Sequence, residues 1–299
     1  MLFVQYVLLP HAFPYFLVLS MVDCHMHMIL DGVEWKRSIA RHADGPKEAY
    51  IQRVLASYRD LGYTYLRDGG DRWGAGKRAR ELAAPMGITY RTPLSPLCKE
   101  GCYGGFIGET FQNEREFARL AEKQKENGAD FIKIMISGLM DFDNPGQLMK
   151  EGPKEAEIAY MIAISKDLGM SVMAHCNGAK AAIAAAKAGV DSIEHGAYLN
   201  EEALWAMKEA TVVWVPTLST IGNLLGKGRY PDKGVEEILE SALSNVNAYQ
   251  VLGGLVACGS DAGAWAVPHG SETEMTWLHK AGMCDADIQI ANREIMKRF

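Results

Sequence analysis

The sequence feature that most constrains the fold is a regular alternation of short apolar segments with longer amphipathic ones. The apolar segments predict strands at 16–22, 63–68, 88–92, 131–136, 170–175, 190–194, 212–215 and 255–258. Most of them are apolar on nearly every residue, which is typical of parallel strands buried on both faces. Eight strand–helix units in 299 residues predict an α/β protein with a (β/α)8 TIM barrel.

The amphipathic segments supply the helices of this pattern. Helices are expected at 46–61, 73–86, 113–127, 154–168, 179–188, 201–209 and 235–252, with two more from about Glu272 and from Asp285. Glycine follows several of them, as it commonly does at helix ends. A glycine-rich loop is expected at 93–108. A doubly wound open sheet is the alternative, but no G-x-G-x-x-G follows the first strand.

The domain organisation predicted from this pattern is simple. Residues 1–15 form an N-terminal extension to which no role is assigned, and residues 16–299 form one barrel domain. The first 22 residues are apolar, but no Lys or Arg precedes the run, and Pro10, His11 and Pro14 interrupt it. We therefore expect neither a signal peptide nor a membrane span there, and Met21 is an alternative start.

Polar residues with metal-ligating chemistry stand at the ends of the predicted strands. In a barrel, the carboxyl ends of all strands converge on one mouth, so residues far apart in sequence meet there. Histidine and aspartate are common zinc ligands, and two histidines at i and i+2 share one face of a strand. The set is His25, His27, Lys133, His175, His195 and Asp261.

Each of these residues also has a purely structural interpretation. His175 alone is more often a satisfied core residue than a ligand, and Asp261 could cap a turn. Lys133 could carry its ammonium to water along an apolar stem. The coincidence of all six at expected strand ends favours a shared site over these separate explanations.

Lys133 is the most informative member of the set. It lies between Ile132 and Ile134, where burial of an ammonium is costly and lowers its pKa. A neutral amine can react with carbon dioxide to form a carbamate, which is an anionic oxygen ligand. A lysine among histidines is therefore sensible only if it is carboxylated or if the metal is absent.

At these residues the chain resembles the amidohydrolase superfamily of metal-dependent hydrolases, and within it the prolidase-like and imidazolonepropionase-related branch. The resemblance covers most of the chain from Val22 to Gly282. Its carriers are Val22-Asp23-Cys24-His25-Met26-His27, Asp130-Phe131-Ile132-Lys133-Ile134, Ala174-His175, Ser192-Ile193-Glu194-His195-Gly196, Val215-Pro216-Thr217-Leu218, Gly259-Ser260-Asp261-Ala262-Gly263 and His269-Gly270.

The resemblance implies a binuclear centre. His25, His27 and Asp261 would hold the more buried ion, His175 and His195 the other, and carboxylated Lys133 would bridge them. Two divalent ions, zinc before manganese or iron, would bind a bridging hydroxide that attacks an amide bond. Asp261 would be the catalytic base and then acid. The substrate class implied is a dipeptide, an N-acyl amino acid or a cyclic amide.

The sequence departs from the branch in three places. The accessory β-sandwich common in it is expected to be largely or wholly missing. The usual Pro-Gly-Leu-Ile-Asp lead into the H-x-H is absent, and Gly138-Leu139 stands where Gly-Gly is expected. None of these departures removes a ligand.

Substrate contacts are expected from the loops after the strands, chiefly 93–108, 139–152 and 218–231. Tyr103, Arg229 and Tyr230 are candidates to hold a substrate carboxylate, and His269 is a candidate to orient the substrate.

Other activities remain open at this point. The same site could hydrolyse an ester, a lactone or a phosphotriester. A one-metal deaminase of a heterocycle would place a Glu shortly after His175, whereas Cys176-Asn177-Gly178 follows here. A barrel without enzymatic activity is the third alternative.

Composition bounds the partners and the compartment. The formal net charge of -6 and the lack of Lys/Arg clusters give no footprint for nucleic acid or an anionic membrane. Six scattered cysteines without a C-x-x-C suit reduced thiols in a cytoplasmic protein. A small-molecule substrate is therefore expected, and a homo-oligomer is possible.

Overall fold

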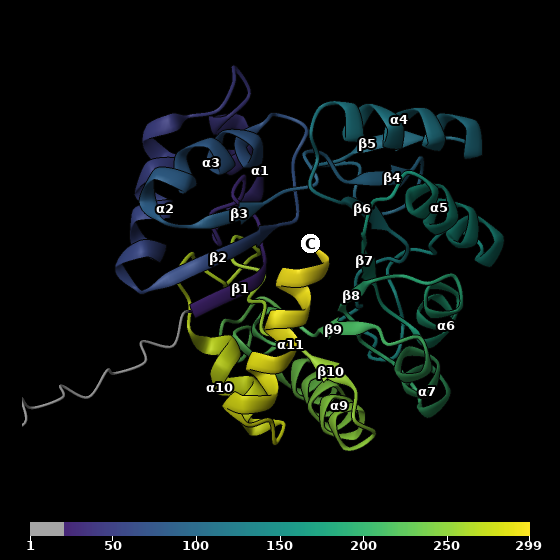
Figure 1. The fold of residues 1–299 in the computed structure, drawn as a ribbon. Helices are drawn as coiled ribbons and strands as arrows, with labels where there is room; N and C mark the ends of the chain where they lie inside the picture. The colour runs from purple at the N-terminus through teal and green to yellow at the C-terminus, as the bar shows by residue number, and fades with distance from the viewer. Residues whose placement is uncertain (1–20) are drawn as a thin grey trace, which may run out of the picture.

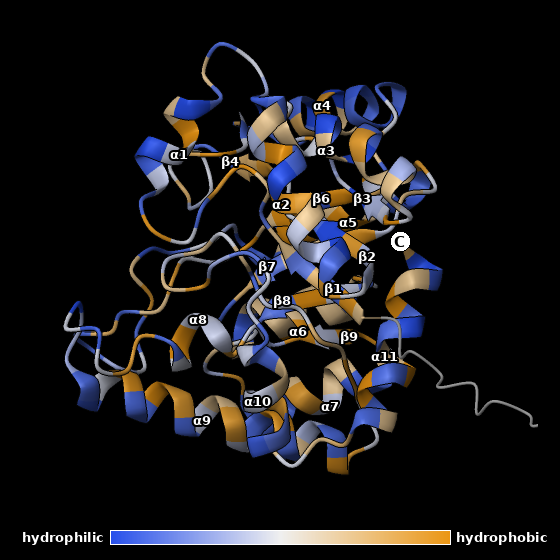
Figure 2. Cartoon of the chain, turned by 90° about the vertical axis from the view of Figure 1, so that its left-hand side faces the viewer, coloured by the Kyte–Doolittle hydropathy of each residue, from blue (hydrophilic) through white to orange (hydrophobic). Residues whose placement is uncertain are grey.

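A computed structural model describes residues 21–299 of the chain. The expected extension at 1–15 and the expected start of the first strand at residue 16 lie outside these residues. The described part alternates strands with helices in the order that the sequence pattern predicts. Figure 1 shows the helices surrounding the strands, and Figure 2 shows the strands as mainly apolar.

The strands all pair in parallel, in two sheets. The first sheet has the order β1-β2-β3 and the second β10-β9-β8-β7-β6-β4-β5. The bounds are β1 Met21–Met26, β2 Tyr63–Asp68, β3 Thr89–Arg91, β4 Leu97–Lys99, β5 Glu109–Phe111, β6 Ile132–Met135, β7 Val172–Cys176, β8 Ser192–His195, β9 Val213–Val215 and β10 Leu255–Val256.

Seven of these strands lie at the expected places, β1 continues past the expected end at residue 22 to Met26, and β4 and β5 are additional. The prediction of a loop over the whole of 93–108 is therefore wrong, because Leu97–Lys99 forms a strand that pairs with both β6 and β5. Close approach permits this pairing: a Cβ on Gly108 would lie 2.5 Å from the carbonyl oxygen of Pro96. The glycines that suggested an open loop instead allow tight packing.

The helices form the outer layer. Their bounds are α1 Trp35–Arg41, α2 Glu48–Asp60, α3 Ala75–Ala83, a 3-10 turn Ala84–Met86, α4 Glu114–Glu126, α5 Glu155–Asp167, α6 Ala179–Lys187, α7 Glu201–Glu209, α8 Ser219–Gly222, α9 Asp232–Val251, α10 Thr273–Lys280 and α11 Asp285–Arg298. Two of them, α1 and α8, are not predicted by the sequence pattern. The side chain of Glu34 caps α1 by accepting hydrogen bonds from the backbone N–H groups of Lys36 and Arg37.

The α/β class and the parallel strands are as predicted, while the strand pairing stops short of one closed ring. Backbone hydrogen bonds nevertheless link the two sheets on one side. Cys24 N–H donates to Cys258 O over 2.8 Å, and Asp261 N–H donates to His25 O over 2.6 Å. These bonds hold the end of β1 against the segment that follows β10, so the strand ends of both sheets face one region.

The interior between the sheets is apolar, and helix α11 covers one end of it. Phe299 packs edge-on against Phe131, with ring centroids 5.2 Å apart. Ala291 and Ile295 of the same helix are fully buried in this cluster. The opposite ends of the strands are left for the polar residues described below.

None of the helices in residues 21–299 is long and apolar enough to cross a membrane. The described strands all belong to the two parallel sheets, and the expected loss of an accessory β-sandwich stays a prediction.

Candidate metal centre

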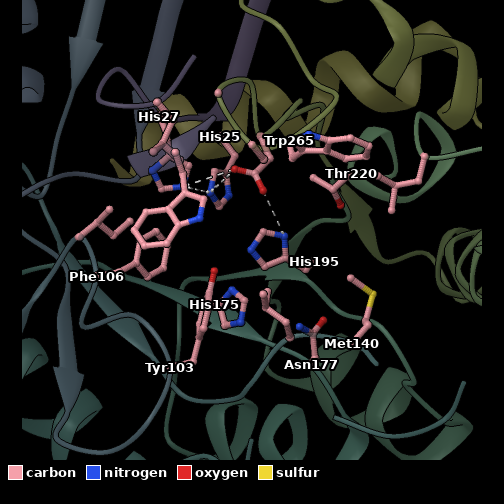
Figure 3. Close-up of a pocket in the computed structure, with 18 of the residues that line it drawn as sticks. His25, His27, Tyr103, Phe106, Met140, His175, Asn177, His195, Thr220 and Trp265 are labelled. Atoms are coloured by element: carbon pink, nitrogen blue, oxygen red, sulfur yellow. Dashed lines mark hydrogen bonds and ion pairs between the residues drawn. The ribbon is translucent and has the colours of Figure 1, made fainter. Parts of the chain in front are cut away.

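All six side chains singled out at the strand ends line one cavity of about 680 Å³. They come from β1 and the residue after it, from β6, β7 and β8, and from the segment after β10 (Figure 3). The residues are His25, His27, Lys133, His175, His195 and Asp261. Side chains more than 200 positions apart in sequence are thus brought together by the parallel strands.

Three of these residues form a compact triangle of donor atoms. Nε2 of His25 lies 3.4 Å from Nε2 of His27 and 3.6 Å from Oδ1 of Asp261, and Nε2 of His27 lies 3.3 Å from the same oxygen. Ligands at about 2.1 Å from a tetrahedral zinc ion are about 3.4 Å apart. The spacing of the triangle therefore fits three ligands of one such ion.

The other two histidines lie beside this triangle. The rings of His175 and His195 have centroids 4.6 Å apart, and Nδ1 of His195 lies 3.9 Å from Oδ2 of Asp261. Ligand atoms of His25, His195 and Asp261 all fall within 4.8 Å of one another. Asp261 therefore stands between the two pairs of histidines, with one oxygen toward each.

Hydrogen bonds fix the orientation of the outer histidines. The hydroxyl of Thr217 lies 2.7 Å from Nδ1 of His195, and the carbonyl of Gly138 lies 3.4 Å from Nε2 of His175. In each ring the second nitrogen is left for another partner. Such support of ligand rings by neighbouring oxygen atoms is common in metal sites.

Lys133 is 1% exposed, and within residues 21–299 no hydrogen bond or ion pair reaches its amine. Burial lowers the pKa of Lys133 to about 8, although the charge of Glu194 opposes the shift. A larger fraction of this amine than of an ordinary lysine is therefore neutral near physiological pH, and the neutral form is the one that reacts with carbon dioxide.

The electrostatics of the cavity favour neutral imidazoles. Burial, reinforced by the positive charge of Lys133, lowers the pKa of His27 and of His175 to about 3. Burial likewise holds the pKa values of His25 and His195 well below the ordinary value. Neutral imidazole is the form that binds a metal ion.

Two buried polar atoms at the centre have no hydrogen-bond partner. They are Oδ1 of Asp261 and Nδ1 of His27. A buried oxygen without a partner is costly, and native proteins usually supply a partner, a water or an ion. Together with the donor triangle, the unpaired Oδ1 shows that the residues present fit a divalent cation.

Backbone strain is concentrated at the same place. Asp261, His195 and Thr217 have φ values of 55°, 69° and 49°. Non-glycine residues in this left-handed region cost about 1–3 kcal/mol each, and such strain gathers at functional sites. Close approach also matters here, since a Cβ at Gly69 would lie 2.1 Å from Cε1 of His27.

Comparison with known proteins shows what this chain is similar to. No protein-family model matches it. The chain is 30% identical over 276 residues to ochratoxinase of Aspergillus niger, covering 80% of this chain and 56% of that protein. It therefore spans little more than half the length of that relative. It is 32% identical over 281 residues to an uncharacterized protein of Mycobacterium tuberculosis, covering 88% of this chain and 69% of the other.

Solved structures show the same fold. A Xaa-Pro dipeptidase with bound methionine superposes with a TM-score of 0.72 at 21% identity, over 93% of this chain and 75% of the other. The structure of A. niger ochratoxinase gives a TM-score of 0.73 at 23% identity, over 92% and 68%. These likenesses confirm the resemblance to prolidase-like proteins of the amidohydrolase superfamily that is seen in the sequence.

A buried ion pair that the sequence interpretation missed lies behind His25. Nδ1 of His25 donates to Oε2 of Glu194 over 2.7 Å, and Nη2 of Arg67 donates to Oε1 of Glu194 over 2.9 Å. Ser192 Oγ donates to Oε1 of Glu194 over 2.5 Å, and Arg67 Nε donates to Cys24 O over 2.6 Å. Two charges inside apolar strands, Arg67 and Glu194, are the sequence signal that could have revealed this pair.

Three of the four expected substrate contacts line the cavity, namely Tyr103, Arg229 and Tyr230. His269 is not among the lining residues. Its Nε2 donates to Leu30 O over 2.9 Å, and its Nδ1 lies 3.4 Å from the hydroxyl of Tyr58. Both ring nitrogens of His269 contact other protein groups. His269 therefore supports the segment between β1 and α1, and its ring has no nitrogen left for a substrate.

Proposed function

We propose that the protein is a metal-dependent hydrolase of an amide bond in a dipeptide, an N-acyl amino acid or a cyclic amide. The observation that carries this proposal is the triangle of His25, His27 and Asp261, whose three donor atoms lie 3.3–3.6 Å apart and include an unpaired carboxylate oxygen. The likeness to ochratoxinase and to a Xaa-Pro dipeptidase supports the same reaction class.

We assign the five ligand side chains and Lys133 to two divalent ions. His25, His27 and Asp261 would hold one ion and His175 and His195 the second, with a carboxylated Lys133 bridging them. Nitrogen and carboxylate donors suit zinc first. Such ions, when bound, polarise the scissile carbonyl and lower the pKa of water.

We assign to Asp261 the transfer of a proton from the attacking water to the leaving group. Burial raises the pKa of Asp261 well above the ordinary value, and the charge of Lys133 opposes this shift. Its Oδ1 would bind the ion held with His25 and His27, so the other oxygen, Oδ2, can accept a proton from the attacking water and pass it to the leaving nitrogen. One carboxylate then serves as base and as acid in turn.

Tyr103 is the residue to hold the carbonyl oxygen of the substrate. Its ring lies against His175, with centroids 4.8 Å apart, and its hydroxyl points into the cavity (Figure 3). Burial raises the pKa of Tyr103, so the hydroxyl stays protonated and can donate. A donor here stabilises the negative charge that develops on the carbonyl oxygen during attack.

We also propose that the two sheets act as one (β/α)8 barrel around this centre. The hydrogen bonds from Cys24 to Cys258 and from Asp261 to His25 support this arrangement. A rigid ring of strands would hold the ligands at fixed spacing without help from the loops.

The test is hydrolysis by protein expressed with zinc. Dipeptides and N-acyl amino acids should be cleaved with release of a free amine, and removal of metal by a chelator should stop the reaction reversibly. Asp261→Asn should abolish turnover while most of the metal stays bound. Retained turnover in that variant would reject the role of Asp261, and no cleavage of any amide by metal-loaded protein would reject the proposed function.

A further inference from the structure

Glu274 of helix α10 is a buried carboxylate that the proposed reaction does not use. It is 1% exposed, and within the described residues no ion pair reaches it. Burial raises the pKa of Glu274 to about 7, although hydrogen bonds from backbone N–H groups oppose the shift. A carboxylate buried without a cation is costly, so it is tolerated only where strong hydrogen bonds replace water.

The partners of this carboxylate are two successive backbone N–H groups at the start of helix α8. Leu218 N–H donates to Oε1 of Glu274 over 2.9 Å, and Ser219 N–H donates to Oε2 over 2.7 Å. Helices α8 and α10 contact each other (Figure 2). A further link joins them, since Oγ of Ser219 lies 2.9 Å from Oγ1 of Thr273. Each oxygen of Glu274 is thus bound by one peptide group, and we call this arrangement the Glu274 clamp.

The clamp holds the residues that directly follow Thr217. Thr217 is fully buried and has a φ of 49°. This left-handed conformation is unfavourable for a residue with a branched Cβ, so the surrounding structure has to impose it. The carbonyl of Thr217 accepts from the N–H and the hydroxyl of Thr220, over 3.0 and 2.8 Å. The backbone of Thr217 is therefore fixed by Thr220 at its carbonyl and by Glu274 at the next two N–H groups.

The hydroxyl of Thr217 is the part of this turn that reaches the metal centre. It lies 2.7 Å from Nδ1 of His195. The backbone of His195 is held separately, because its carbonyl accepts a hydrogen bond from Nε1 of Trp214 over 3.0 Å. The orientation of the imidazole ring, in contrast, depends on where the Thr217 hydroxyl points.

We propose that Glu274 is a positioning residue for His195 and acts through Thr217, an inference that rests on the proposed metal-dependent hydrolysis. The carboxylate fixes the turn at 217–219, and the turn directs the hydroxyl of Thr217. The hydroxyl then holds the imidazole of His195 where a ligand of the second ion is required. Glu274 is not among the residues that line the cavity, so its effect has to pass through the turn.

The first part of the test measures the reactivity of His195 in metal-free protein, at a pH above the pKa of Glu274. Diethyl pyrocarbonate acylates neutral imidazoles, and peptide mass analysis reports each histidine separately. Glu274→Gln replaces one carboxylate oxygen by an amide nitrogen, so one backbone N–H group loses its acceptor. Acylation of His195 should become about fivefold faster, the factor expected when one hydrogen bond is lost. The rate at His175, whose ring contacts the carbonyl of Gly138, should stay unchanged.

The second part shows whether the effect passes through Thr217. Thr217→Val removes the hydroxyl and should raise the rate at His195 by a similar factor. Adding Glu274→Gln to this variant should raise the rate no further, because the hydroxyl that Glu274 positions is already gone. Rate increases that multiply in the double variant, or an equal increase at His175, would show general loosening of the fold and overturn the inference.

Two further variants keep the comparison matched. Glu274→Asp retains the charge on a side chain one methylene shorter, so its rate at His195 should fall between those of wild type and Glu274→Gln. It also serves as the test if Glu274→Gln does not fold, and a wild-type rate at His195 in Glu274→Asp would then reject the inference. Glu272→Gln, an exposed change just before α10, should behave as wild type.

The third part separates this inference from the proposed function. In Glu274→Gln, chelator competition should show about fivefold weaker binding of one zinc ion and unchanged binding of the other. A rate at His195 that responds to Glu274 through Thr217, in a protein that cleaves no amide, would reject the hydrolase and keep the positioning role. Amide cleavage together with a rate at His195 that ignores Glu274→Gln would keep the hydrolase and reject the positioning role.

Discussion

Glu194 accepts a hydrogen bond from Nδ1 of His25 over 2.7 Å, and both side chains are completely buried. A carboxylate can only accept, so Nδ1 carries the proton and Nε2 presents its lone pair to the cavity. The guanidinium of Arg67 compensates the charge of Glu194 from the other side. The tautomer of a candidate metal ligand is thus set by a buried ion pair that never reaches the cavity itself.

We expect Glu194→Gln to weaken metal binding by about 10- to 100-fold, because the amide no longer forces the required tautomer of His25. Chelator competition measures the affinity of the purified protein for zinc. Glu202→Gln, an exposed change on α7, serves as the control and should leave the affinity unchanged. An unchanged affinity in Glu194→Gln would show that His25 does not depend on this partner.

Lys133→Ala is expected to lower the metal content from about two ions per chain to one or fewer, since the bridging oxygen ligand is lost. Elemental analysis of the purified variant gives this number. Added propionate should restore part of the content by supplying a carboxylate in the space left by the side chain. Lys187→Ala, at the exposed end of α6, should behave as wild type. Two ions in Lys133→Ala without propionate would exclude a bridging role.

Gly69→Ala is expected to damage the centre through its shape alone. The new Cβ would lie 2.1 Å from Cε1 of His27, so the ring must leave its present position beside His25 and Asp261. We expect a loss of about 1–3 kcal/mol in the free energy of unfolding, together with weaker metal binding. In Gly105→Ala the nearest contact is 3.4 Å, to Cγ2 of Thr110, and stability should hardly change. Chemical denaturation of both variants measures the change in the free energy of unfolding. An equal change in the two variants would contradict the prediction.

The α/β class, the parallel strands and the meeting of the six strand-end residues in one cavity were predictable because they depend on local sequence patterns. Near-continuous apolar runs such as 131–136 identify buried parallel strands, and a polar residue at the end of each, such as His175, identifies the mouth. Strands β4 and β5 were not predictable, because their glycines are equally typical of an open loop and of close packing. Only three-dimensional contact distinguishes the two.

The supporting residues were harder to predict for a similar reason. Arg67 and Glu194 lie on strands more than 120 positions apart. The sequence does not reveal that these two charges pair with each other. His269 follows a shared His-Gly pattern, yet its orientation toward Leu30 depends on how two distant loops pack. A pattern along the chain identifies the type of a residue more readily than the direction in which its side chain points.

The stability of the metal-free protein should fall on acidification, and His175 should contribute to that slope. Its pKa is about 3 in the folded state and 6.5 in the reference state, so between these values the unfolded chain binds more protons. The contribution of His175 to the free energy of unfolding is therefore complete above pH 6.5, and it is lost as the pH falls from 6.5 toward 3.

His175→Gln should reduce this slope by up to one proton, or about 1.4 kcal/mol per pH unit. Urea denaturation at a series of pH values measures the difference from wild type, in which the contributions of all other groups cancel. His279→Gln, at an exposed position, should retain the wild-type slope. A slope in His175→Gln equal to that of wild type would show that His175 is already protonated in the fold.

The central claim is that six side chains from distant strands hold a pair of metal ions. Diffraction from crystals of zinc-loaded protein, with anomalous data at the zinc edge, tests it most directly. We predict two anomalous peaks in the cavity, one among His25, His27 and Asp261 and one beside His175 and His195, with a carbamate on Lys133 between them. A cavity without any peak in zinc-loaded crystals, or with Lys133 and Asp261 turned away from the histidines, would contradict the claim.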